Sequence, residues 1–190
     1  MSFIHVQPVL KKAKKVVLYW DSRERQWVGD SSSAYRLYDI PAVVNHENIF
    51  DMMGIDADKR TKYFTFEKDL PDVFLGDYGE NMDWMVPFKY HGDLHHVIRS
   101  GEQTICVLDH YLKPLRCFNG KEDYRIEEVG ILKYLVVNVG AMPVAVILGE
   151  PVGKEMVNRL QYTVDCLETI AVPSEKKLFD PDTLEVDDEE

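Results

Sequence analysis

The sequence predicts an α+β fold: a mostly antiparallel, curved sheet of hairpins with short helices and one long C-terminal helix packed on it. Short runs rich in β-branched and aromatic residues alternate with turn residues along most of the chain, which is typical of hairpins. One long segment, residues 153–172, has the apolar spacing of a helix. With 190 residues, of which 45% are hydrophobic, the chain is long enough for one well-buried core.

The first strands are expected before residue 41. Three runs have strand character and are separated by the polar turns DSRER and DSSS: residues 16–20, 26–29 and 34–40. Pro41 ends the third run, because proline cannot donate to a ladder. A short helix is predicted from the N-cap Asn45 through Met53, with Gly54 in the left-handed position that follows a helix.

More strands are expected in the middle of the chain. Residues 62–67 resume strand character, whereas residues 68–83 contain glycines, a proline and many acids and are expected to form a loop. Three further runs are interpreted as strands, the last two joined by the turn SGEQ: residues 84–92, 93–100 and 104–109. Residues 117–124 are expected to form a loop, because Asn119-Gly120 is a strong turn signal.

The most apolar segments, residues 131–139 and 144–149, predict a central hairpin joined by GAMP. Their near-continuous hydrophobicity implies that both faces of the hairpin are covered. The segment 153–172 is expected to supply that cover as a helix ended by Pro173, because apolar residues recur in it at spacings of three and four: Met156, Leu160, Val164, Leu167 and Ala171.

Composition divides the chain into three parts. Residues 1–15 contain four lysines and are expected to form a basic arm, residues 16–173 a single α+β domain, and residues 174–190 a disordered acidic tail. There is no secretory leader pattern and no apolar stretch of about 20 residues, so we expect a soluble, cytoplasmic protein. The three cysteines share no C-x-x-C spacing and are expected to be reduced.

The net charge of -11 bears on the kind of partner. A field of this sign repels phosphate backbones, so direct binding to duplex nucleic acid is not expected. It attracts a basic protein surface, or it serves only to keep the protein soluble.

The segment YHGDLHH, residues 90–96, raises the possibility of a metal site. On a strand, His91, Asp93 and His95 would point to one face, and Asp109 or His110 on a neighbouring strand could complete a shell for zinc or another divalent ion. A turn at Gly92 would break this alternation, and the histidines would then be surface residues near a hairpin. We therefore expect no cofactor, with a divalent metal as the alternative.

A nucleophilic site is a weaker alternative. Cys106 or Ser100 could act as nucleophile with His110 as the base. No G-x-S-x-G elbow is present, and Cys106 lies in an apolar run where a thiol is usually inert. Nucleotide-binding glycine loops are also missing from the sequence.

Residues 77–84 combine acidic and aromatic side chains. Tyrosine and tryptophan anchor many protein interfaces, because they bury a large area and keep a polar group. We therefore expect a surface for a protein partner, which would itself be basic, formed by Asp77, Tyr78, Glu80, Asp83 and Trp84.

Three segments resemble, in order and spacing, uncharacterised proteins encoded in phage and prophage clusters of gut Firmicutes: KKAKKVVLYWDSRERQWVGD (11–30), KYHGDLHHVIRSGEQTICVLDHYLKPL (89–115) and LFDPDTLEVDDEE (178–190). The resemblance implies a phage or mobile-element setting, and hence the cytosol of a host cell, and it supplies no activity. The expected function is a non-enzymatic accessory protein that binds another protein and inhibits a host nucleic-acid-binding or defence system. The alternatives are a metal-dependent hydrolase at His91, Asp93 and His95, and a virion or assembly component, which would be a homo-oligomer.

Overall fold

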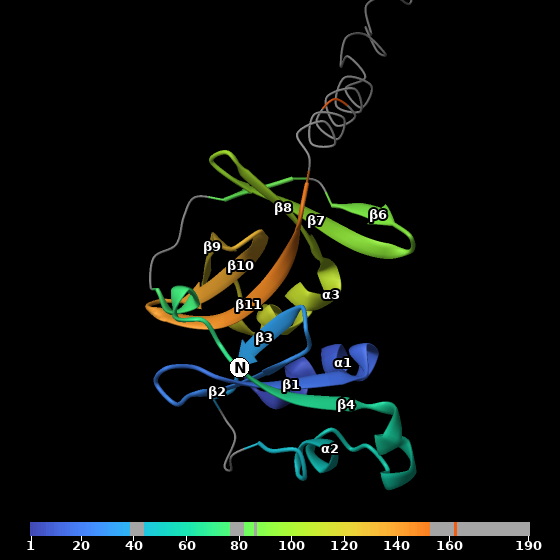
Figure 1. Cartoon of the computed structure of the whole chain (residues 1–190). Helices are drawn as coiled ribbons and strands as arrows, with labels where there is room; N and C mark the ends of the chain where they lie inside the picture. The colour runs from blue at the N-terminus through green and yellow to red at the C-terminus, as the bar shows by residue number, and fades with distance from the viewer. Residues whose placement is uncertain (39–43, 77–81, 86, 153–161, 163–190) are drawn as a thin grey trace, which may run out of the picture. The chain divides into compact units, whose positions relative to one another are not determined.

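The structure is a computed structural model, and it describes residues 1–38, 44–76, 82–85, 87–152 and 162. The chain divides into two compact units, Met1–Val152 and Gly153–Glu190. All helices and strands named below belong to the first unit (Figure 1). None of the described helices is long and apolar enough to cross a membrane.

The chain begins with helix α1 (Phe3–Ala13), in the segment for which a basic arm was expected. Its buried side chains Val6, Val9 and Leu10 follow the spacing of one helix face, while Lys11 and Lys12 lie in its last turn, where cations interact favourably with the helix dipole. Lys14, in a left-handed conformation, ends the helix.

Three antiparallel strands follow: β1 (Lys15–Trp20), β2 (Gln26–Gly29) and β3 (Ser33–Arg36). Aspartate side chains build both connecting turns. Asp21 accepts hydrogen bonds from the backbone N–H groups of Arg23 and Arg25, and Asp30 accepts one from the N–H of Ser32.

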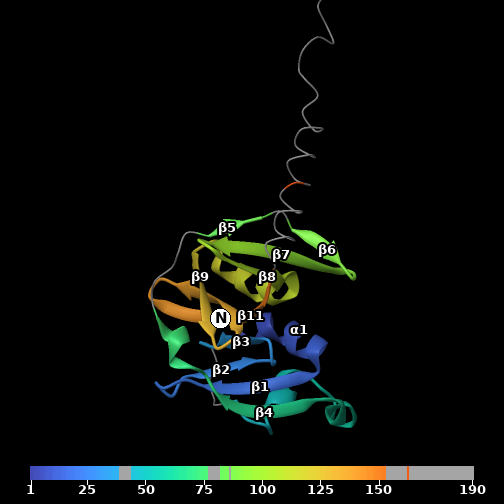
Figure 2. The same ribbon diagram turned by 45° about the horizontal axis from the view of Figure 1, so that its top comes forward.

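The next segment returns to β1 from its other side. It contains α2 (Ile49–Met52), the 3-10 helix η1 (Ala57–Lys62), β4 (Phe64–Asp69) and the 3-10 helix η2 (Asp72–Leu75). β4 pairs with β1 in parallel, a pairing that a chain of hairpins does not predict. In Figures 1 and 2, β4 lies at the lower border of the sheet, with β1 above it.

A second group of strands surrounds β7 (Asp93–Ser100). β8 (Gln103–Leu108) pairs with one edge of β7, and the short strands β5 (Asp83–Trp84) and β6 (Phe88–Tyr90) also pair with β7. The chain then turns through α3 (Asp109–Leu112) and the 3-10 helix η3 (Lys113–Phe118). Figure 2 shows β5 and β6 along β7.

The last three strands form a meander: β9 (Glu122–Val129), β10 (Leu132–Val139) and β11 (Met142–Pro151). β11 joins the two groups of strands, because it pairs with β3 through residues 145–147 and with β8 through residues 150–151. Gly149 permits this crossing. A Cβ atom at this position would lie only 2.8 Å from Cβ of Ile105 on β8.

The central hairpin of β10 and β11 is covered on both faces, as its apolar sequence predicts. Leu135 and Val137 belong to one core cluster with Val6 and Leu10 of α1. Val136 and Val146, which point to the other face, belong to a second cluster with Phe74 of η2. Cover therefore comes from the N-terminal helix and η2, two elements that the sequence analysis did not assign.

The predicted α+β class is wrong. The described unit is mostly sheet, with eleven strands and only short helices. The helix predicted over 153–172 lies outside the described residues, apart from residue 162, so no long C-terminal helix is part of the described fold. The physical reason is that the central hairpin finds its cover within residues 1–152. The loop predicted over 117–124 is also corrected, because β9 starts at Glu122.

Candidate functional site

The candidate site lies where β7, β8 and α3 meet, and Asp109 is at its centre. Asp109 is the first residue of α3, directly after the buried strand β8, and is 8% exposed. The imidazole of His96 on β7 lies next to it, with Nε2 3.1 Å from Oδ1 of Asp109. Because an ionised carboxylate only accepts hydrogen bonds, the Nε2–H of His96 is the donor.

Two cations also face Asp109. The ammonium of Lys113 and the guanidinium of Arg116 each lie 3.4 Å from its carboxylate. Burial by itself would raise the pKa of Asp109. The hydrogen bonds from His96 and Lys113, with the charges of Lys113 and Arg116, outweigh burial and hold this pKa below its usual range. Asp109 is therefore ionised at neutral pH and organises the three side chains around it.

Trp84 packs against the same histidine. Its ring meets His96 edge-on at 6.0 Å and Tyr124 of β9 edge-on at 5.2 Å, yet Trp84 is 42% exposed. A cavity of about 360 Å³ opens beside the ring, and its lining includes Trp84, His96, Asp109, Arg116, Glu122 and Tyr124. We call the solvent-facing part of this region, formed by Trp84, Tyr124, Arg116 and Glu122, the Trp84 surface.

A second cavity, of about 670 Å³, is lined by α1, the turn between β6 and β7, and α3. Asp109 lines this cavity as well. Lys12 and Asp93 form an ion pair of 3.0 Å there, and the hydrogen bond from Lys12 lowers the pKa of Asp93. Burial lowers the pKa of His110, and the charge of Lys12 lowers it further. The cavity has the volume of a small-molecule site, with a neutral imidazole and paired charges in its wall.

The structure does not bring the four predicted metal ligands together. His91 lies in the β6–β7 turn with a positive φ of 49°, and Asp93 is paired with Lys12. His95 stacks on Phe88 at 5.3 Å, on the face of β7 opposite to His96. The histidine that contacts Asp109 is His96, which was not among the predicted ligands. Within the described part of the chain, no group of three or more His, Cys, Asp or Glu side chains is arranged to hold a metal ion.

The predicted partner-binding residues are only partly placed. Asp77, Tyr78 and Glu80 lie outside the described residues. Asp83 and Trp84 form β5, where neighbouring side chains point to opposite faces. Asp83 pairs with Arg99 at 3.0 Å on one face, and Trp84 meets His96 on the other.

The two candidate nucleophiles lie on the β7–β8 hairpin. Cys106 is buried on β8, where burial raises the pKa of its thiol to about 11. Its sulfur lies 3.5 Å from Nδ1 of His95, whereas the expected base His110 lines the larger cavity. Ser100 is the last residue of β7. The thiol is protonated at neutral pH, which is the state of an inert core cysteine.

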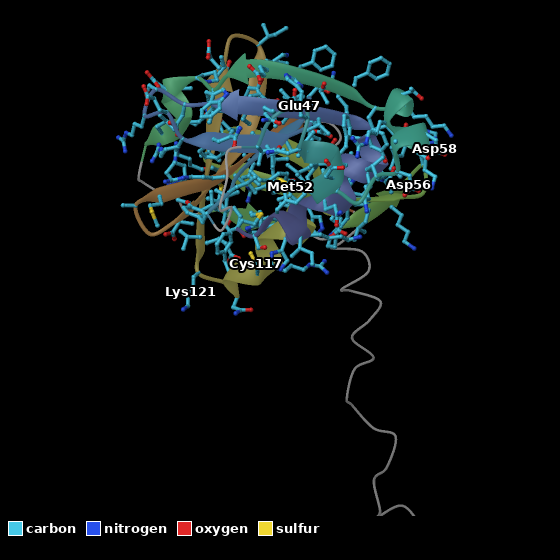
Figure 3. All side chains as sticks on the ribbon, turned by 90° about the horizontal axis from the view of Figure 1, so that it is seen from below. Glu47, Met52, Asp56, Asp58, Cys117 and Lys121 are labelled. Carbon is cyan, nitrogen blue, oxygen red and sulfur yellow. The ribbon has the colours of Figure 1, made fainter. Side chains whose placement is uncertain are left out.

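Sequence reasoning missed three members of the site: Arg116, Glu122 and Tyr124. Arg116 and Glu122 flank the Asn119-Gly120 turn, which was interpreted only as a loop. Figure 3 labels Cys117, in η3, and Lys121, in the connection between η3 and β9. Tyr124 is the third residue of β9, the strand that the sequence analysis did not predict. The alternation of Tyr124 with charged neighbours was the available signal.

A scan against models of protein families gives no match, and searches of curated proteins and of solved structures give none either. The geometry of the site is therefore what supports a function.

Proposed function

We propose that this protein is a non-enzymatic accessory protein of a phage or mobile element, and that it acts by binding another protein with Trp84 as the anchor. The observation that carries this proposal is an exposed tryptophan whose ring is already held by His96 and Tyr124. A side chain that is ordered before binding loses little conformational entropy when the partner arrives. Trp84 is therefore suited to bind in the rotamer it already has.

The surroundings of Trp84 support a protein as the partner. Tryptophan, tyrosine and arginine contribute most of the binding energy in many protein interfaces. All three residue types, as Trp84, Tyr124 and Arg116, line the cavity of about 360 Å³. The buried carboxylate of Asp109 lies 3.4 Å from the guanidinium of Arg116, so it holds this guanidinium in place while the side chain stays exposed. Glu122 adds a polar group to the rim.

Charge supports a basic partner. The net charge of -11 attracts a positively charged surface and speeds encounter with it. Asp77, Glu80 and Asp83, which precede Trp84 in the sequence, would add to this attraction. A basic protein surface that normally holds nucleic acid has the matching charge, so we propose inhibition of a host nucleic-acid-binding or defence protein.

The experiment is capture from a bacterial lysate with the full chain as bait, in the presence of nuclease, followed by mass spectrometry. Three baits are compared: wild type, Trp84→Ala, and the triple variant Asp77→Asn/Glu80→Gln/Asp83→Asn. Tyr90→Ala is the matched control, because Tyr90 is an exposed aromatic residue on the neighbouring strand β6.

We expect one basic protein that wild type and Tyr90→Ala retain after nuclease treatment and that Trp84→Ala loses. The triple variant should retain less of it than wild type at low salt, and this difference should shrink as the salt concentration rises, because salt screens the electrostatic attraction that the variant lacks. Circular dichroism establishes that each bait is folded. Equal retention of the same protein by wild type and a folded Trp84→Ala would overturn the proposal.

A further inference from the structure

The outer edge of β4 is the second exposed feature of the fold. Among the described strands, only β1 pairs with β4, so β4 ends the strand order. The backbone N–H groups of Phe64 and Leu70 bond to carbonyls of Lys14 and Trp20, on the β1 side. Because backbone groups alternate in direction along a strand, Phe66 and Lys68 also face β1, while Thr65, Glu67 and Asp69 present N–H and C=O groups to the free edge.

β4 exposes two large aromatic side chains. Phe64 is 65% exposed and Phe66 is 44% exposed, and both point to the same face. On the opposite face, Glu67 and Asp69 of β4 are also exposed, whereas the neighbouring strand β1 is buried there and shares a core cluster with Ile49 of α2 through Val16 and Leu18. Figure 3 shows α2, with Met52 labelled, beside the sheet that β4 borders. Charged side chains on an edge strand normally prevent pairing, and β4 carries them in its second half, whereas the two exposed phenylalanines of its first half favour pairing.

We propose that β4 pairs antiparallel with β4 of a second copy of this chain, around a two-fold axis at Phe66. This axis is perpendicular to the sheet, so a side chain and its symmetry copy point to the same face of the joined sheet. Residues opposite each other also share a face, so their numbers must differ by an even number. With the axis at Phe66, Phe66 faces its own copy, Phe64 faces Lys68, and Thr65 faces Glu67. Thr65 and Glu67 are the residues whose backbone groups point outward, so they form the hydrogen-bonded pairs.

Charge selects this register over its neighbour. An axis at Glu67 would pair as many residues of β4, but it would place two carboxylates directly opposite each other, which is destabilising. An axis at Thr65 would pair only residues 64–66 of the strand. With the axis at Phe66, each Lys68 ammonium lies across from a Phe64 ring, a favourable cation–π arrangement. Lys15 already contacts the Phe66 ring in this way, at 5.3 Å from its centroid.

The dimer would leave the Trp84 surface free. β4 and β5 lie at the two ends of the strand order, so each copy pairs at one end and presents Trp84 at the other. The dimer would thus carry two copies of the proposed partner site, and a partner with two binding surfaces would be held more tightly than by one copy alone.

The first test is the mass of the full chain in solution, measured by light scattering during gel filtration at micromolar concentration. We expect twice the chain mass of 22.0 kDa. Phe66→Glu places two like charges at the axis and should give the monomer mass with an unchanged circular dichroism spectrum. Ile131→Glu, the same kind of change at an exposed apolar residue in the β9–β10 turn, should remain a dimer. A monomeric wild type, or a folded Phe66→Glu that remains dimeric, would overturn the inference.

A second test does not require disrupting the interface. Residues opposite each other in a non-hydrogen-bonded pair lie close enough for a disulfide, so Phe66→Cys should cross-link two copies on mild oxidation. The background carries Cys117→Ser and Cys166→Ser, and Lys89→Cys on the exposed strand β6 is the control. Efficient cross-linking at position 66 and not at position 89 supports the register, and equal cross-linking at both positions contradicts it. Neither outcome depends on Trp84, so the dimer and the proposed function can fail separately.

Discussion

Replacing Arg125 with methionine should lower the free energy of unfolding by several kcal/mol, because this arginine is buried and all its hydrogen bonds are to protein groups. Arg125 lies on β9 and is only 1% exposed. Its guanidinium donates to the carboxylate of Glu127 at 2.8 Å, to the carbonyl of Gly76 at 3.0 Å and to that of Val73 at 3.4 Å. It thereby fixes the end of η2 against β9.

The magnitude follows from these partners. Methionine keeps much of the volume, so the cost comes mainly from lost hydrogen bonds and from the partners left behind. A hydrogen bond that involves a charge contributes about 1.5–3 kcal/mol, and the carbonyl of Val73, at the longest distance, contributes least. Breaking a buried ion pair by removing one partner costs about 3–5 kcal/mol. Because Glu127 retains some access to water, we expect about 3–4 kcal/mol for Arg125→Met, a large part of the 5–15 kcal/mol typical of a domain.

The assay is equilibrium unfolding in urea, followed by tryptophan fluorescence and circular dichroism. Arg99→Met is the matched control: Arg99 also pairs with a carboxylate, that of Asp83 at 3.0 Å, but both side chains are exposed. Its cost should stay below about 1 kcal/mol. A double change, Arg125→Met/Glu127→Met, should recover part of the loss, because no unpaired charge remains. Equal costs for Arg125→Met and Arg99→Met would refute this reasoning.

Three further predictions concern single residues. Asp109→Asn should lower the free energy of unfolding by about 2 kcal/mol at pH 7. Because the folded pKa of Asp109 lies below its unfolded value, this difference is present above about pH 4 and is lost as the pH falls through the folded pKa. A difference that does not decrease as the pH is lowered below about 4 would contradict it. Gly29→Ala should destabilise by about 3 kcal/mol in urea unfolding, because its Cβ would lie 1.8 Å from the carbonyl oxygen of Ser33, and an unchanged midpoint would speak against this close approach. Cys106 should react with iodoacetamide at pH 8 about 100-fold more slowly in the folded protein than after denaturation, since burial raises its pKa to about 11, and comparable labelling of its peptide in both states would show that the thiol is accessible.

Local patterns predicted most of the strands and little of their arrangement. The β-branched run before Asp21 and the apolar runs after residue 130 are strands in the structure, because a pleated, buried surface suits these residues. Helix α1 was missed for a local reason: Pro8 interrupts its pattern and its lysines suggested an arm. The parallel pairing of β4 with β1 depends on a return of the chain through residues 44–63, which no local pattern reveals.

The site was predicted in part. Sequence spacing identified the histidine-rich segment and Asp109, but it placed His91, Asp93 and His95 on the face that meets Asp109. In the structure, the register of the β7–β8 hairpin gives that role to His96. A change of one residue exchanges the two faces of a strand, and the turn at His91 and Gly92, both with positive φ, sets where the strand begins.

Arg125 shows a limit of composition-based reasoning. Arginine is usually exposed, and the loop predicted over residues 117–124 ends directly before Arg125, so no sequence pattern indicated that this side chain lies in the interior. The structure buries this side chain because Gly76 and Val73, about fifty residues earlier, supply carbonyl acceptors. Such long-range partners cannot be inferred from the charges of the segment itself.

The most direct test of the central claim is the dissociation constant of the captured partner for wild type and for Trp84→Ala, measured by isothermal titration calorimetry at one salt concentration. An anchor tryptophan contributes about 2 kcal/mol or more, so we predict that the affinity falls by about 30-fold or more while Tyr90→Ala binds like wild type. Dissociation constants within about twofold of each other for wild type and a folded Trp84→Ala would contradict Trp84 as the anchor.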